Sequence, residues 1–188
     1  MSEGKMGFAG SLTTKKIGAK VPHLYRIRNY FRRFGTFDGK ITIKAELHAI
    51  MFPANGGRPV NLGLLSTRVV TNAGVAYLAA NFIGTNAPNA FNFHDCGTGT
   101  NAESVSDTAL QTPYGGARAT GTQSNPSAPV YRTVGTISFT STLAITEHGI
   151  FSASSSGTLW DRSVFSAINV VSGDSIQFTY NLTINAGG

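Results

Sequence analysis

The stretch SIQFTYNLTI at residues 175–184 decides the class of fold. Its apolar side chains stand at every second position: Ile176, Phe178, Tyr180, Leu182 and Ile184. Alternate side chains of an extended chain point to opposite faces, so this pattern predicts a strand with one face in a core. The stretch KITIKAELHAI at residues 40–50 has the same alternation and predicts a second such strand.

Further segments extend the β pattern along the chain. Strands are expected at 91–96, 131–143, 144–152 and 159–168, with Trp160 and Phe165 in the core. Turns or loops are expected at 38–39, 53–59, 97–107, 123–129, 154–157 and 173–174, because Gly, Pro, Ser and Asn gather there. Several strands separated by such breaks predict a mainly β fold, an antiparallel β-sandwich of jelly-roll-like type.

One segment predicts a helix. Thr71 or Asn72 is a suitable N-cap, and the helical pattern continues to Ile83. Within it, one face carries Val75, Leu78, Ala79 and Phe82. We therefore expect one short helix beside the sheets.

Charge divides the chain into two parts. Residues 1–58 hold 11 basic and three acidic residues, a net charge of +8, whereas residues 59–188 hold four basic and six acidic residues, a net charge of −2. Charged residues make up only 13% of the whole chain, about half the usual share. These features predict an extended basic and aromatic N-terminal arm at 1–37 and a β-sandwich domain at 38–188 that suits contact with neighbours.

The arm carries the candidate binding residues. Arginines and aromatic residues interleave in PHLYRIRNYFRRF, and in an extended chain Arg26 and Arg28 face one side while Tyr25 and Ile27 face the other. The residues expected to bind a partner are Tyr25, Arg26, Arg28, Tyr30, Phe31, Arg32 and Arg33. A protein surface is the favoured partner, because clustered aromatic and arginine side chains are typical of interfaces. Binding of nucleic acid and a merely solvated arm are the less favoured alternatives.

The usual signatures of enzyme chemistry are weak here. The loop Gly97–Thr100 (GTGT) lacks the Lys and the following helix of a phosphate-binding loop, so an ordinary turn is expected. His94 and Cys96 should face away from Asp95 on a strand, and Glu147 away from His148, so neither set forms a triad or metal site alone. Cys96, the one cysteine, is expected to be a buried thiol. The sequence predicts no catalytic residue, metal or cofactor.

Four stretches carry a resemblance to a known group. They are TNAGVAYLAANFIG (71–84), FNFHDCGTGTNAESVSDTALQTPYGGAR (91–118), YRTVGTISFTSTLAITEHGIFSAS (131–154) and GTLWDRSVFSAINVVSGDSIQFTYNLTI (157–184). Together, over residues 68–186, they resemble a β-rich domain of virion proteins of tailed bacteriophages. The resemblance implies a structural role without enzyme activity or cofactor, in either the head or the tail. Asp107 is expected to cap the turn before Ala109–Leu110.

These observations predict a capsid decoration or cement protein that stabilises the shell through its arm. Its expected partners are the major capsid protein or other virion proteins, together with its own copies, with a trimer favoured. The alternative is a tail, baseplate or fibre component involved in host attachment; a depolymerase is a weaker third, because no acid pair is visible. No membrane span or secretory signal stands out in the sequence, so we expect assembly in the host cytoplasm and a final location in the virion.

Overall fold

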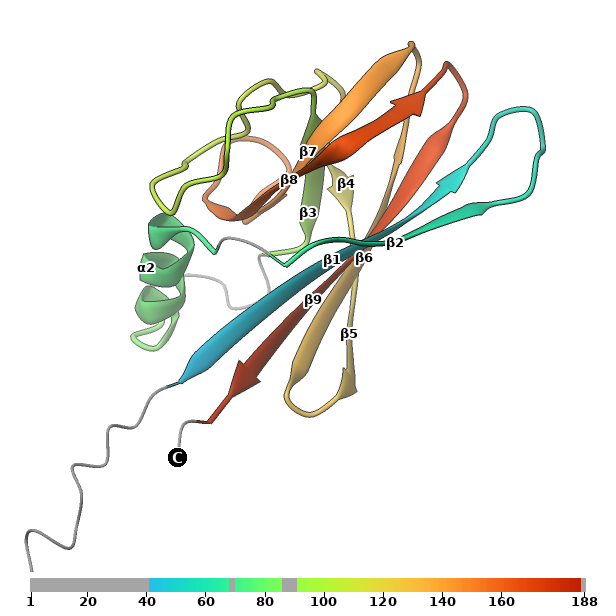
Figure 1. The fold of residues 1–188 in the computed structure, drawn as a ribbon. Coiled ribbons are helices and arrows are strands. Elements are labelled where there is room, and N and C mark those ends of the chain that lie inside the picture. The colour runs from blue at the N-terminus through green and yellow to red at the C-terminus, as the bar shows by residue number, and fades with distance from the viewer. Residues whose placement is uncertain (1–40, 68–69, 86–90, 187–188) are drawn as a thin grey trace, which may run out of the picture. The chain divides into compact units, whose positions relative to one another are not determined.

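The computed structural model describes residues 41–67, 70–85 and 91–186. These residues form two antiparallel sheets and one short helix (Figure 1). The mainly β fold with one helix, predicted from the sequence, is therefore confirmed. The arm predicted for 1–37 and the turn predicted at 38–39 lie outside the described residues.

Five strands make the larger sheet. In spatial order they are β2 (Val60–Ser66), β1 (Thr42–Phe52), β9 (Ser175–Asn185), β6 (Val130–Ser138) and β5 (Thr122–Ser127). Strand β9 lies at the centre, paired along its whole length with β1 and from Ser175 to Thr183 with β6. The two alternating segments predicted as strands, 40–50 and 175–184, are therefore neighbours in this sheet. Ala45 lies opposite Leu182 and Ala49 opposite Phe178.

Four strands make the smaller sheet. Their order is β4 (Ala119–Thr120), β3 (Phe93–Gly97), β7 (Leu143–Phe151) and β8 (Leu159–Val170). Both sheets contribute to one core, as the β-sandwich prediction requires. Its buried members include Leu47, Ile137, Ile176 and Phe178 from the larger sheet, and Cys96, Ile145, Ile150 and Trp160 from the smaller one.

The helix α2 (Asn72–Asn81) packs beside β8. Thr71 is its N-cap: the hydroxyl accepts a hydrogen bond from the Gly74 amide at 3.0 Å and donates one to the Leu159 carbonyl at 2.6 Å. A Cβ built on Gly74 would lie 2.9 Å from the Trp160 carbonyl oxygen, so glycine permits this close approach. The helix ends two residues before the predicted Ile83.

The edge strands of the larger sheet explain two differences from the sequence expectations. A turn or loop was predicted at residues 123–129, but strand β5 occupies most of this segment. Strand β5 is exposed throughout and contains Pro126, which an edge strand tolerates since its outer N–H is not needed for pairing. Strand β2 has two register shifts against β1, which disturb the alternation that would reveal it. Both features make an edge less able to pair with another chain.

Candidate functional site

The residues predicted to bind a partner lie outside the described part of the chain. These are Tyr25, Arg26, Arg28, Tyr30, Phe31, Arg32 and Arg33, all before residue 41. The structure therefore places none of them. The described residues offer three other features: a buried histidine pair, a charged cluster that holds a loop, and an apolar pocket.

The segment His94–Cys96 forms no triad. Imidazole Nδ1 of His94 lies 3.1 Å from Nε2 of His148, and its Nε2 lies 3.1 Å from the Thr133 hydroxyl. Burial lowers the pKa of His94 to about 3 and holds that of His148 well below its usual value, so both rings are neutral. Asp95 instead accepts a hydrogen bond from the Arg118 guanidinium at 3.2 Å. Cys96 is fully buried, as predicted, and burial raises the pKa of its thiol.

Glu147 anchors the loop that follows β3. Its carboxylate accepts hydrogen bonds from the amides of Gly99 (3.1 Å), Gln111 (3.0 Å) and Thr112 (2.7 Å). The side chain has no exposed surface, and the Arg162 guanidinium lies 2.9 Å away. The GTGT loop is therefore more than an ordinary turn, because one of its amides binds an internal carboxylate. A Cβ on Gly99 would lie 2.5 Å from that carboxylate, which explains the glycine.

Arg162 extends this cluster to the far side of the loop. It contacts Asp107 at 2.9 Å and the Asn101 carbonyl at 3.2 Å. Asp107 caps the turn 104–107, which lies before Ala109–Leu110: its carboxylate accepts from the Ser104 amide at 2.8 Å, and its own amide donates to the Ser104 carbonyl at 3.0 Å. We call Glu147, Arg162 and Asp107, with the loop segment 97–112, the loop anchor.

Glu147 and His148 point to opposite faces of β7, as predicted. Glu147 meets the loop, whereas His148 stacks on Phe178 of the facing sheet, with ring centroids 4.4 Å apart. A further buried chain runs from Trp160 Nε1, which donates to the Tyr180 hydroxyl at 2.7 Å, to Asp161, 3.3 Å from that hydroxyl. Burial raises the pKa of Asp161 well above its usual value. The side chains of Trp160, Tyr180 and Asp161 are thus hydrogen-bonded to one another and buried.

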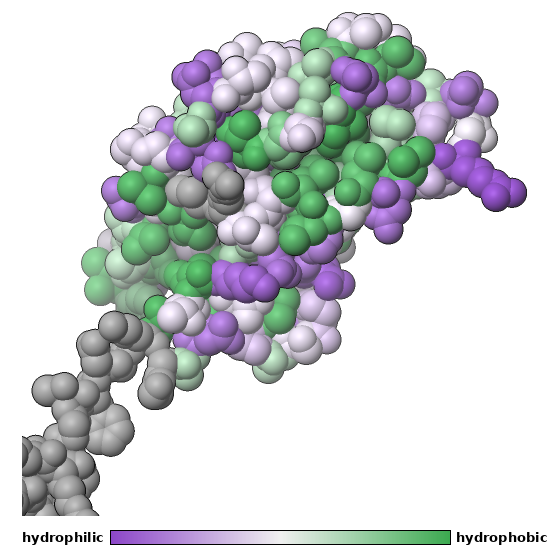
Figure 2. Space-filling model, in the orientation of Figure 1, coloured by the Kyte–Doolittle hydropathy of each residue, from purple (hydrophilic) through white to green (hydrophobic). Residues whose placement is uncertain are grey.

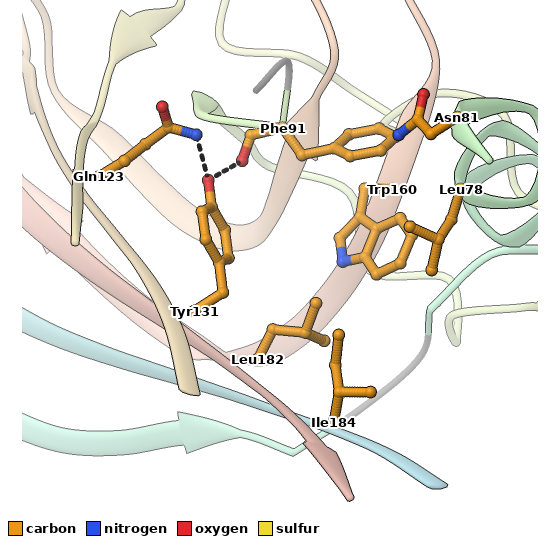
Figure 3. Close-up of a pocket in the computed structure, with 8 residues that line it drawn as sticks. All are labelled: Leu78, Asn81, Phe91, Gln123, Tyr131, Trp160, Leu182 and Ile184. Atoms are coloured by element: carbon orange, nitrogen blue, oxygen red, sulfur yellow. Dashed lines mark hydrogen bonds between the residues drawn. The ribbon is translucent and has the colours of Figure 1, made fainter. Parts of the chain in front are cut away.

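The apolar pocket opens between α2 and the two sheets (Figure 3). Its volume is about 210 Å³. Five elements and one connecting segment supply its lining: Leu78 and Asn81 from α2, Phe91 from the segment before β3, Gln123 from β5, Tyr131 from β6, Trp160 from β8, and Leu182 and Ile184 from β9. Aromatic and aliphatic side chains make most of the wall, which is typical of a binding pocket.

Hydrogen bonds and ring contacts fix the aromatic wall. The Tyr131 hydroxyl donates to the Phe91 carbonyl at 2.7 Å and lies 2.8 Å from Gln123 Nε2, which donates to it. The Phe91 and Trp160 ring centroids are 4.8 Å apart, and Tyr77 packs edge-on against Phe91 at 4.7 Å. The side-chain oxygen of Asn81 is buried without a hydrogen-bond partner. The pocket is thus preformed, with one unmet acceptor among its lining residues.

Sequence reasoning missed the pocket. Trp160 and Leu182 were expected in the core, but the sequence offered no sign that they share a cavity with Leu78 and Phe91. Two neighbouring apolar residues, Phe82 and Ile83, directly follow the helix and are 86% and 77% exposed in the structure. Such exposure of neighbouring large apolar side chains marks contact surfaces.

The chain was compared with family models, curated proteins and solved structures, and none of them matches it. Within the described ranges, no three His, Cys, Asp or Glu side chains gather so as to hold a metal ion. In the same part of the chain, no helix is long and apolar enough to cross a membrane.

Proposed function

We propose that this chain is a non-enzymatic structural component of a bacteriophage virion, a capsid decoration or cement protein that stabilises the shell through its N-terminal arm. One observation carries the proposal: the described part of the sandwich exposes few charged side chains, whereas the sequence before it is strongly basic. The resemblance of residues 68–186 to phage virion domains points the same way.

The structure sharpens the charge argument, because most of the acids in the domain are turned inward. Asp95, Glu147, Asp161 and Asp174 are all buried, and so is Arg162. Among the described charged residues, only Lys44 and Arg58 are exposed, and the others are buried or half-buried. A surface with few charges loses little hydration free energy when neighbours pack against it, which suits a protein that functions within an assembly.

The arm supplies the opposite chemistry. Its basic and aromatic residues suit an acidic protein surface, with arginine making charge-assisted hydrogen bonds and the rings making apolar contact. An arm that bridges several shell subunits would clip them together by multivalent binding. The partner in this proposal is the major capsid protein or another virion protein.

Copy number in purified particles tests the proposal. We expect quantitative mass spectrometry to find copies on the order of hundreds per particle, since a cement protein follows the symmetry of the shell. About six to a few dozen copies would overturn the cement role. They would support the alternative, a tail, baseplate or fibre component involved in host attachment, which the aromatic wall of the apolar pocket favours because such walls bind ligands.

A second measurement tests the arm itself. Full-length protein in which Arg26, Arg28, Arg32 and Arg33 are replaced by Gln should bind stripped particles more weakly than the unaltered chain. Replacing Lys5, Lys15, Lys16 and Lys20 by Gln removes the same charge elsewhere and should matter less. Raised salt should weaken binding of the unaltered chain, because exposed charges are screened. Equal binding by both variants would contradict the role of the arginines.

A further inference from the structure

The apolar pocket continues onto an exposed apolar surface. Ile184, which lines the pocket, is 37% exposed, and it pairs with Ile43 near the start of β1. Ile41 is 69% exposed, and Phe82 and Ile83 directly follow Asn81 of the pocket lining. Figure 2 shows hydrophobic side chains gathered over α2 and beside it. We call the pocket with Ile41, Phe82, Ile83 and Ile184 the docking surface.

The chemistry of this surface restricts its occupant. The wall formed by Phe91, Tyr131 and Trp160 favours an aromatic or aliphatic side chain, since rings pack edge-on or offset against one another. The Asn81 oxygen has no hydrogen-bond partner, but it is buried and so is not open to an occupant of the pocket. A tyrosine ring or an aliphatic side chain suits the wall.

The chain's own sequence contains such an occupant. In an extended segment, Tyr25 and Ile27 share one face while Arg26 and Arg28 share the other. One face could therefore enter an apolar pocket while the other stays free for a charged partner. The two chemistries predicted for the arm need not compete for one surface.

Length allows this segment to reach a second copy. Ile27 precedes Ile41 by 14 residues, which span up to about 48 Å when extended, at about 3.4 Å per residue. A domain of this size has a radius of gyration of roughly 15 Å. The described chain begins at Ile41, just before strand β1, and Ile43 of β1 pairs with Ile184 of the pocket lining.

We propose that the docking surface binds the Tyr25–Ile27 face of the N-terminal arm of a second copy, so that copies associate by exchanging arms. The inference deepens the proposed function, since it rests on the arm being a contact segment. Its test uses the purified full-length protein without any particle. It can therefore fail or succeed independently of binding to a capsid.

Trp160 makes the pocket observable, because it is the only tryptophan of the chain and lines the pocket. Sedimentation and Trp160 fluorescence should be followed together over a dilution series. Trp160 is only 2% exposed, so its emission reports packing at the pocket wall rather than contact with water. We expect oligomers at high concentration and, as they dissociate, a change in the Trp160 emission because the arm no longer packs against that wall. Association without any Trp160 change, or a Trp160 change independent of concentration, would overturn arm exchange.

Matched variants of the arm test its apolar face. Tyr25→Ser with Ile27→Ser should raise the dissociation constant at least about tenfold, since removal of a buried aromatic anchor has a large effect. Lys16→Ser with Lys20→Ser changes two other positions of the same segment and should leave it within about threefold, because exposed charges contribute little. Equal effects of the two pairs, or none, would contradict the assignment of Tyr25 and Ile27 to the contact.

Matched variants of the domain test the pocket. Ile184→Arg places a charge at the pocket rim and should abolish both the association and the Trp160 change, while Val171→Arg, at a site 51% exposed outside the lining, should preserve them. Circular dichroism and the melting temperature check folding, and Ile184→Ser repeats the test with a smaller side chain. Association that survives both Ile184 variants would overturn the proposal. So would a chain that stays monomeric but changes its Trp160 emission when shells are added, since a capsid protein would then be the occupant.

Discussion

The loop anchor and the apolar pocket share strand β8 and show opposite chemistry. At the loop anchor, the buried Glu147 carboxylate accepts hydrogen bonds from three loop amides and from Arg162. At the pocket, apolar walls face a cavity, and the Asn81 oxygen has no partner. The carboxylates of Glu147 and Asp107 thus bind Arg162 and the loop within the chain, whereas the pocket leaves an apolar cavity that an added group can fill. Variants in the two regions test this difference.

Removing the charge of Glu147 should damage the loop anchor most. Glu147→Gln keeps the shape, but its amide group opposes the loop N–H groups and leaves Arg162 with Asp107 as its only acid partner. We expect the free energy of unfolding to fall by about 3 kcal/mol or more, as for a broken buried pair. Urea unfolding measures it.

The matched control is Glu46→Gln. Glu46 pairs with Lys44, whose side chain is 61% exposed, so the expected loss is below about 1 kcal/mol. Equal losses of unfolding free energy in the two variants would show that the loop anchor contributes no more than a surface ion pair. The difference between the two regions would then be contradicted.

Acid should weaken the strands that carry the loop anchor, because His94 and His148 lie on β3 and β7. Burial lowers the pKa of His94 from 6.5 to about 3. Its contribution to stability is therefore present above the unfolded pKa and is lost as the pH falls from 6.5 toward 3. Between pH 8 and pH 5 this histidine alone should cost roughly 2 kcal/mol.

The difference between the unaltered chain and His94→Gln isolates this effect. Carboxyl groups with raised pKa values, such as Asp161, act in the opposite direction, since the folded state holds their proton. They are present in both chains and largely cancel. Parallel stability curves for the two chains between pH 8 and pH 5 would show that His94 is not held neutral in the fold.

Truncating the pocket wall should have the smallest effect on stability. Leu78 is only partly buried, so Leu78→Ala should lower the free energy of unfolding by about 1 kcal/mol. Leu110 lies within the loop anchor segment and is 5% exposed, so Leu110→Ala should cost about 2–4 kcal/mol. Thermal and urea unfolding of both variants compare the regions directly. A larger loss at Leu78 would mean that the pocket region is structural, and the contrast would reverse.

Local signals were enough for most elements. Strands β1 and β9 alternate without interruption, and Thr71 stands where a helix needs a cap, so these segments could be assigned from the sequence. Strand β5 was mistaken for a break because its polar residues and Pro126 resemble a loop. Strand β2 was missed because its register shifts remove the alternation.

The site features depend on contacts between distant residues, which periodicity does not reveal. Glu147 binds amides 35, 36 and 48 residues away. The pocket lining combines Leu78, Trp160 and Leu182, which lie far apart in the sequence. The sequence indicated that these residues are apolar or polar, but the order of strands in the sheets decides which ones become neighbours.

The burial of Cys96 also makes the protein a convenient background for chemical labelling. Since it is the only cysteine, fully buried and with a raised thiol pKa, it should stay unreactive toward maleimides while the domain is folded. A cysteine introduced at an exposed position such as Phe82 would then take the label alone. Conversely, slow modification of Cys96 in the unaltered chain would time the opening of the sandwich, with no foreign probe in the molecule.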